Sequence, residues 1–141
     1  MSTSNTTIQP YVNFDGRCDE AIELYKRALG AEVVFLMRYK DNPEPPQAGC
    51  ATPGTEEKVM HANLRIGDTT VLVSDGRCGG KTEFKGINLA LISKNEAEAK
   101  ERFAALADGG EVQMPMAKTF FSPAFGMVQD RFGVGWMVLV Q

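Results

Sequence analysis

The order of the predicted elements repeats once along this chain, and that repeat limits the folds it can adopt. Each half reads strand, helix, strand, loop, strand, strand. Ala21 and Tyr25 in the first helix match Ala99 and Phe103 in the second, about 78 residues later. The match is one of pattern and not of identity. It predicts an α+β fold in which one domain, residues 1–141, is built from two tandem βαβββ modules.

The first module is expected over about residues 8–75. Apolar residues at spacings of three and four predict a helix over Asp19–Leu29, with acids early, bases late and Gly30 as its stop. A Gly67-Asp68 turn predicts a hairpin between the last two strands. Residues rich in Val, Phe and Leu predict four strands: Ile8–Phe14, Glu32–Tyr39, Lys58–Ile66 and Thr69–Ser74.

The second module is expected over about residues 86–141. Its helix is predicted over Glu96–Ala107, with Asn95 as the N-cap and Glu98 three residues later. Asp130 opens a hairpin turn, where we expect its carboxylate to bind the nearby backbone. The predicted strands are Ile87–Ile92, Val112–Met116, Phe125–Gln129 and Trp136–Val140.

Two loops interrupt this pattern. Asp41–Glu57 holds four prolines and two glycines, which predicts a long surface loop that could act as a lid. Gly76–Lys81 is rich in glycine and basic residues, but it lacks the spacing of a phosphate-binding loop and no helix follows it. We therefore interpret it as a connection.

Composition excludes several classes of protein. A net charge of −3 over 141 residues argues against nucleic acid as the main partner. No apolar run approaches the roughly 20 residues of a membrane-spanning helix, and Met1–Thr7 shows no secretory pattern. The three cysteines, Cys18, Cys50 and Cys78, are scattered and fit reduced thiols. We therefore expect a cytoplasmic protein with no membrane partner.

His61 is the chain's one histidine and the main candidate for acid–base chemistry. Strand alternation places it on one face with Asn63 and Arg65. A metal site needs several converging ligands, and a single histidine on a strand is more often a hydrogen-bonded pocket or core residue. We take His61 as the candidate catalytic residue and expect no metal.

Aromatic and sulfur-containing side chains gather in the last quarter of the chain. Phe120 and Phe121 are adjacent, so one can be buried while the other faces a cavity. Phe125, Trp136 and Met137 follow on short strands. These side chains could line an apolar pocket, and the alternative is that they form core.

These residues resemble the PhnB-like proteins, a branch of the vicinal oxygen chelate superfamily that includes glyoxalase I, bleomycin-resistance proteins and extradiol dioxygenases. Some members carry a demethylubiquinone methyltransferase-like label, for which the sequence shows no glycine-rich loop. The resemblance covers almost the whole chain through these segments: Pro10–Phe14, Gly16–Tyr25, Leu29–Glu32, His61–Asp68, Ser74–Asp75, Thr119–Phe120 and Phe125–Met137.

The resemblance implies modules whose strands curl into a cup, and a homodimer that can exchange modules between chains. It also implies four metal-ligand positions, which fall near Gln9 or Pro10, on the Val71–Val73 strand, near Asn88 and near Met137. None of these residues is His or Glu, and only Gln9 and Asn88 could offer oxygen. We therefore expect no cofactor, although a displaced divalent metal stays possible.

Three hypotheses remain. The first is a metal-independent protein that binds a small molecule, with Phe120, Phe121, Phe125, Trp136 and Met137 as lining and His61, Arg65 and Asp75 as polar anchors. The second is an enzyme of this superfamily, of the lyase or oxidoreductase type, with a non-standard metal site or none and His61 as its general base. The third is an interaction protein whose cup is packed core.

Overall fold

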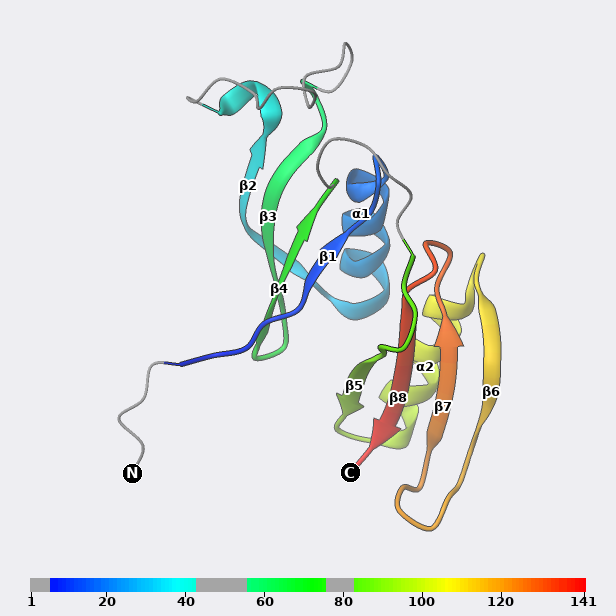
Figure 1. Ribbon diagram of the computed structural model, residues 1–141. Helices are drawn as coiled ribbons and strands as arrows, with labels where there is room; N and C mark the ends of the chain where they lie inside the picture. Colours follow the sequence, from blue (N-terminus) through cyan, green and yellow to red (C-terminus); the bar gives the residue numbers. More distant parts are fainter. Residues whose placement is uncertain (1–5, 43–55, 76–82) are drawn as a thin grey trace. The chain divides into compact units, whose positions relative to one another are not determined.

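The structure, a computed structural model, describes residues 6–42, 56–75 and 83–141. These residues form two four-stranded sheets and two α-helices (Figure 1). The chain divides into two compact units, residues 1–26 with 30–81 and residues 27–29 with 82–141. The element order confirms the predicted α+β fold and the repeated βαβββ pattern.

The first unit contains a mixed sheet, called here the first sheet, with the strand order β1-β4-β3-β2. Strands β1 and β4 run parallel, while β3 is antiparallel to both of its neighbours. A short 3₁₀ helix follows β2. The elements are β1 (Tyr11–Asn13), α1 (Cys18–Leu29), β2 (Glu32–Arg38), η1 (Tyr39–Asp41), β3 (Val59–Ile66) and β4 (Thr69–Ser74).

The second unit repeats this arrangement in the second sheet, whose strand order is β5-β8-β7-β6. Here β5 and β8 run parallel, and β7 is antiparallel to both of its neighbours. The helix α2 packs on one face of this sheet (Figure 1). The elements are β5 (Leu89–Ser93), α2 (Glu96–Ala107), β6 (Glu111–Ala117), β7 (Phe125–Gln129) and β8 (Gly135–Val140).

Both helices form where the sequence predicts them. Gly30 ends α1 in the left-handed conformation, at φ 68°, and its N–H donates to the Lys26 carbonyl. Asn95 caps α2 by accepting the Glu98 N–H at 2.8 Å. The helix ends are therefore set by residues that are readable in the sequence.

Some strand ends differ from the prediction. The regular strand β1 covers only Tyr11–Asn13, although the Pro10 carbonyl still accepts the Leu72 N–H. Strand β2 stops at Arg38 because the Asp41 carboxylate accepts the Arg38 N–H and turns the chain into η1. Strand β5 begins at Leu89 and not at Ile87.

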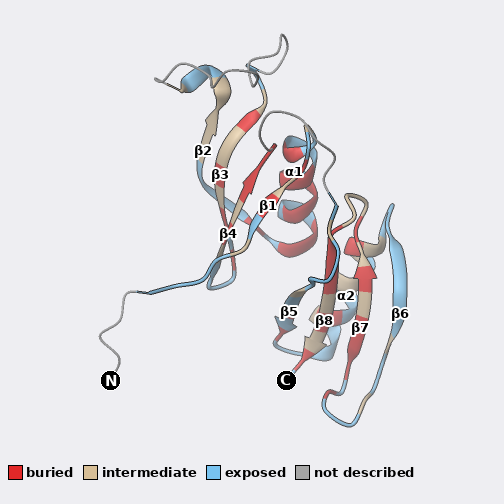
Figure 2. Ribbon diagram, viewed as in Figure 1, coloured by how far each residue is buried: buried red, intermediate tan, exposed pale blue. Residues whose placement is uncertain are grey.

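Buried residues gather in the central strands β3, β4, β7 and β8, while the edge strands β2 and β6 are more exposed (Figure 2). Because side chains alternate along a strand, the central strands present one buried and one more open face. In the first sheet Ala62, Leu64 and Val73 belong to the buried face. In the second sheet Val128 and Val138, both fully buried, lie on the face that carries α2. The opposite faces hold most of the candidate site residues.

Candidate functional site

The open face of the first sheet brings four strands together in one row. Tyr11 on β1 pairs with Leu72 on β4, Leu72 pairs with Asn63 on β3, and Asn63 pairs with Phe35 on β2. His61 lies two residues before Asn63, on the same face. We call this set, Tyr11, Phe35, His61, Asn63 and Leu72, the His61 face.

The imidazole of His61 contacts two aromatic rings on the same face, one from each edge strand of the first sheet. Its ring centroid lies 5.7 Å from that of Tyr11 and 6.3 Å from that of Phe35. Its Nε2 atom lies 2.7 Å from Asn63 Oδ1. Because a carboxamide oxygen only accepts, an N–H at Nε2 donates in this contact. Asn63 therefore holds the orientation of His61 through Nε2.

Arg65 extends the same face but has a charged partner. Its guanidinium forms an ion pair with Glu32 on β2, and both side chains are more than half exposed. Such an exposed pair is screened by water. Arg65 is thus positioned at the margin of the His61 face with its charge already balanced.

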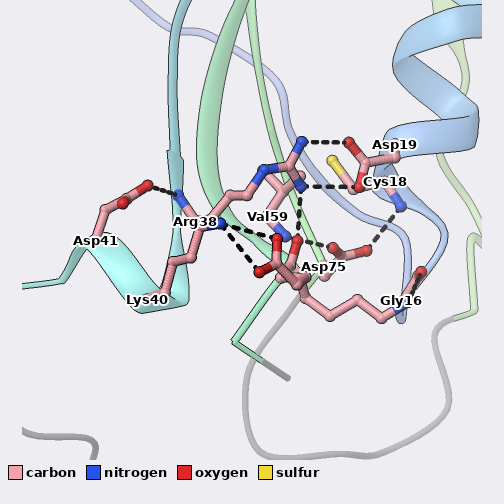
Figure 3. A network of polar contacts seen from close by, with 10 residues as sticks. Gly16, Cys18, Asp19, Arg38, Lys40, Asp41, Val59 and Asp75 are labelled. Carbon is pink, nitrogen blue, oxygen red and sulfur yellow. Dashed lines mark hydrogen bonds and ion pairs between the residues drawn. The ribbon is translucent and has the colours of Figure 1, made fainter. Parts of the chain in front are cut away.

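Asp75 is buried and faces the backbone. Its Oδ1 accepts the N–H of Cys18 at 2.7 Å, and its Oδ2 accepts the N–H of Val59 at 2.7 Å (Figure 3). One carboxylate therefore ties the first residue of α1 to the first residue of β3. This geometry favours a structural role for Asp75 over that of a ligand anchor.

Cys18 is fully buried beside this carboxylate. Burial, together with the negative charge of Asp75, raises the pKa of the Cys18 thiol far above its ordinary value. A thiol in this environment stays protonated and is a poor nucleophile.

Arg38 joins the end of β2 to the first turn of α1 (Figure 3). Its two terminal nitrogens each lie 3.0 Å from an oxygen of Asp19, and one of them also donates to the Glu57 carbonyl. The hydrogen bond to Asp19 raises the pKa of the Arg38 guanidinium. Lys40 binds the Glu57 carboxylate nearby.

Several sequence predictions fall outside the described residues. The predicted lid Asp41–Glu57 includes residues 43–55, which the structure does not describe. The Gly76–Lys81 connection and the thiols Cys50 and Cys78 also lie outside the described ranges. These stay predictions.

The second unit brings three phenylalanines together at one end of its sheet. Phe120, Phe121 and Phe125 form a chain of edge-to-face contacts, with successive centroids 5.1 Å apart. Phe120 is fully exposed, Phe121 is about half exposed and Phe125 is buried. Thr119 Oγ1 accepts the N–H groups of Phe121 and Ser122, which holds the turn that presents these rings.

Met137 and Trp136 point to opposite faces of the second sheet. Met137 pairs with Met127 on β7, away from α2, and is half-buried. Trp136 pairs with Val128 on the face that carries α2, and its Nε1–H donates to Asp130 Oδ2 at 2.9 Å. Of the two, only Met137 belongs to the open face.

Asp130 confirms the expected turn chemistry. Its Oδ1 accepts the N–H groups of Phe132 and Val134, while its Oδ2 holds the Trp136 indole. The carboxylate is 3% exposed and its acceptor capacity is used by the hairpin. Trp136 and Asp130 therefore support the fold of the second unit.

The residues at the family's implied metal positions do not fit a divalent ion. Val71 and Val73 are buried in the first sheet, and Met137 offers only a thioether. Within residues 6–42, 56–75 and 83–141, no group of three or more His, Cys, Asp and Glu side chains comes together. His61 has an amide and two aromatic rings as its neighbours.

Two site residues were not singled out from the sequence. Tyr11 and Phe35 lie on separate strands, and their place beside His61 depends on the strand register. Alternation along each strand shows which side chains share a face, but the pairing of distant strands is not written in that pattern. Asn63 was recognisable, since it shares the face of His61 on the same strand.

Comparison with known proteins identifies the family. The family model described as 3-demethylubiquinone-9 3-methyltransferase matches residues 6–139. Protein YjdN from Escherichia coli strain K12 is 36% identical over 140 residues, which covers 94% of each chain. The chain belongs to this PhnB-like family. These family members are uncharacterised, so membership gives no specific function.

Solved structures agree with this assignment. Protein PA1353 from Pseudomonas aeruginosa is 38% identical, with a TM-score of 0.85 over 97% of this chain and 98% of that one. The PhnB protein from Bacillus cereus, whose description carries the same methyltransferase name, is 25% identical with a TM-score of 0.77 over 96% and 100% of the two chains.

The fold is also found beyond the PhnB-like proteins. A glyoxylase/bleomycin resistance protein/dioxygenase domain from Frankia sp. EAN1pec is 12% identical, with a TM-score of 0.66 over 99% of this chain and 98% of that one. This match shows the glyoxalase/bleomycin-resistance/dioxygenase fold. None of the helices in the described part of the PhnB-like chain has the length and apolar character needed to cross a membrane.

Proposed function

We propose that this PhnB-like protein binds a small aromatic molecule on the His61 face without the help of a divalent metal. The observation that carries the proposal is the placement of the His61 imidazole between two aromatic rings, with its Nε2 atom held by Asn63. Binding sites typically combine apolar and aromatic surface with a few placed polar groups.

The exposed ring surface supports an aromatic ligand. Tyr11 is 51% exposed and Phe35 is 45% exposed, although both lie in strands. A planar ligand would cover these rings and gain both apolar burial and ring stacking. A hydroxyl group on that ligand would form a hydrogen bond with Nδ1 of His61, the ring nitrogen that Asn63 does not contact.

The charge of the site favours a neutral ligand over an anion. Arg65 is the cation on this face, and its partner Glu32 already balances it. A phosphonate would have to compete with that carboxylate, whereas a quinone or a phenol would not. Of these ligand classes, quinones and phenols fit the His61 face better than phosphonates.

The open face of the second sheet offers apolar lining of its own. Phe121, Phe125 and Met137 lie there, joined by Met127 and by Met114, which is 46% exposed. Thioether and phenyl groups adapt to flat apolar surfaces. We propose that these side chains form a separate ligand-binding surface within the second unit, while Trp136 packs in the core of that unit.

A thermal-shift screen tests the proposal, with a hydroxyquinone, an aryl phosphonate and bleomycin as probes. We expect the hydroxyquinone to give the largest rise in Tm. His61→Leu and Tyr11→Leu should each weaken its binding about tenfold, since each removes one contact worth about 1–2 kcal/mol. Glu101→Gln, on the exposed side of α2, is the matched control.

The proposal fails if none of the three probes raises Tm. It also fails if the hydroxyquinone binds His61→Leu and Tyr11→Leu as tightly as it binds the parent protein. A phosphonate that binds more tightly than the quinone, with loss in Arg65→Ala, would move the ligand class to anions and Arg65 to the anchoring position.

An enzyme is the second candidate function, and one contact favours it. Asn63 occupies Nε2 of His61, so Nδ1 is the ring nitrogen that would take a proton from a substrate. A lyase or an oxidoreductase could use such a base beside a displaced metal. Metal analysis of the purified protein separates the two: a stoichiometric divalent ion that His61→Ala loses would favour the enzyme.

We also propose that the chain forms a homodimer, with module exchange as one arrangement. Strand β2 is an edge of the first sheet and exposes Val33, Val34 and Phe35. Strand β6 is an edge of the second sheet and exposes Val112 and Met114. Proteins usually cover apolar edges. Light scattering should show a dimer, and Val34→Lys should shift it toward monomer.

The thiol chemistry supports a cytoplasmic location as part of this proposal. Cys18 is free and buried in the first unit. A protein with such a reduced thiol fits a reducing compartment.

A further inference from the structure

A pocket lies within the second unit, apart from the His61 face. Its volume is about 240 Å³, smaller than the roughly 300–1,000 Å³ of pockets that hold drug-sized ligands. Every described residue that lines it is uncharged. The lining consists of Phe84, Gly86, Ile87, Asn88, Gln113, Gln129, Gly133 and Gly135.

Three of the residues that line this pocket, Asn88, Gln113 and Gln129, carry carboxamides, and we call it the amide pocket. The Gln129 Nε2 atom donates to the Gly133 carbonyl at 3.2 Å, which holds that side chain in place. Its oxygen and its second N–H are then left for a ligand.

Glycine at position 135 makes room for the Asn88 carboxamide. A Cβ atom on residue 135 would clash with Asn88 Oδ1, so glycine lets the amide keep its place over β8. Residue 135 is buried and pairs with Gln129 across the sheet. The backbone thus brings two of the three carboxamides to one end of β7 and β8.

We propose that the amide pocket binds a neutral, planar nitrogen heterocycle of the nucleobase type. A carboxamide presents a donor and an acceptor side by side, which matches the paired donor and acceptor edge of such a ring. Phe84 supplies an aromatic surface in the same pocket, on which a flat ring can stack.

The uncharged lining of the amide pocket disfavours charged ligands. Neither an anion nor a divalent cation finds a charged partner among the described lining residues. The pocket contains Asn88, the position that the resemblance marks for a third metal ligand, and its neighbours there are amides and not carboxylates. The volume suits one ring system.

The test is a binding measurement by saturation-transfer NMR and calorimetry, with adenine and cytosine as probes and ribose as the non-planar control. We expect both bases to bind and ribose not to bind. Asn88→Leu and Gln113→Leu keep the size of each side chain and remove its hydrogen bonds. Each should weaken base binding about tenfold, and Gln141→Leu, which removes an exposed amide outside the pocket, should change nothing.

Three results would overturn the proposal: no binding of either base, equal binding by Asn88→Leu and Gln113→Leu, or binding of ribose as tight as that of the bases. Asn88 and Gln113 are both exposed, so the two leucine variants should keep the circular dichroism spectrum of the parent protein. His61→Leu separates this site from the proposed function. It should weaken quinone binding about tenfold and leave binding of the bases unchanged, because His61 belongs to the first unit.

Discussion

The two units share one topology but hold their helices in different ways. In the second unit Asn95 caps α2 locally, with its side chain accepting an N–H three residues along the chain. In the first unit the residue before α1, Arg17, makes no side-chain cap. There Asp75, 57 residues away, accepts the Cys18 N–H and the Val59 N–H together.

The two helices thus obtain hydrogen-bond partners for their first N–H groups in different ways. The first N–H groups of any helix lack partners inside the helix. A local cap works as soon as the helix forms, whereas the Asp75 cap exists only once β3, β4 and α1 are in place. The start of α1 therefore depends on tertiary structure, and the start of α2 depends on local sequence.

Asp75→Ala should have the largest effect of the changes that compare the units. It leaves two buried N–H groups without partners, which costs about 3 kcal/mol of unfolding free energy. Urea unfolding followed by circular dichroism measures the loss. Asp75→Asn, which keeps one acceptor, should lose less than Asp75→Ala. Equal losses would contradict the two-bond role of the carboxylate.

Gly126→Ala probes the packing of α2 on the second sheet and should cost about 2 kcal/mol through overpacking. A Cβ atom at this position would lie 2.7 Å from the Phe103 ring of α2. In the first unit, β3 has a fully buried alanine, Ala62, which pairs with Val73 on β4 as Gly126 pairs with Val138 on β8. The first unit therefore already has a side-chain methyl group where the second unit has glycine. The double change Gly126→Ala with Phe103→Leu should recover part of the stability. A Gly126→Ala protein as stable as the parent would show that α2 does not press on β7.

Cys18 gives the first unit a dependence on high pH. Its pKa is raised in the folded state, so the folded protein keeps a proton that the unfolded chain releases above the ordinary value of 9.0. The contribution is therefore complete below pH 9 and is lost as the pH rises further. Between pH 8 and pH 10 the loss is about 1.4 kcal/mol.

Unfolding of the parent protein and of Cys18→Ala at both pH values isolates this contribution. The alanine variant should lose less stability between pH 8 and pH 10 than the parent protein does. Equal losses in the two proteins would mean that Cys18 ionises in the folded state as easily as in water.

Asn95→Ala should have the smallest effect, about 1 kcal/mol, because it removes one exposed local cap. The ratio of this loss to that of Asp75→Ala measures how much more the long-range cap contributes. Asn95→Ser keeps an acceptor and serves as the control. The distinction between local and long-range caps would be lost if Asn95→Ala destabilised the protein as much as Asp75→Ala.

The sequence was sufficient for features that depend on nearby residues. The helices, the Asn95 cap and the Asp130 turn follow from spacings of two to four residues. The repeat predicted the order of the elements in both units. The family resemblance predicted the fold, which the comparison structures confirm.

The site depended more on long-range pairing and was only partly predictable. Asn63 could be assigned to the face of His61, but Tyr11 and Phe35 required the register of β1 and β2. Adjacent residues such as Trp136 and Met137 must face opposite ways, yet alternation does not say which one is buried. The long-range bonds of Asp75 left no local signal at all.

The most direct test of the central claim uses the fact that His61 is the chain's one histidine. Its imidazole gives a single set of resonances in a ¹H–¹³C spectrum, which can be followed while the hydroxyquinone is titrated into the metal-free protein. We predict a saturable shift of these resonances that Asn63→Leu weakens. Quinone binding that leaves the imidazole resonances in place would contradict the assignment of ligand binding to the His61 face.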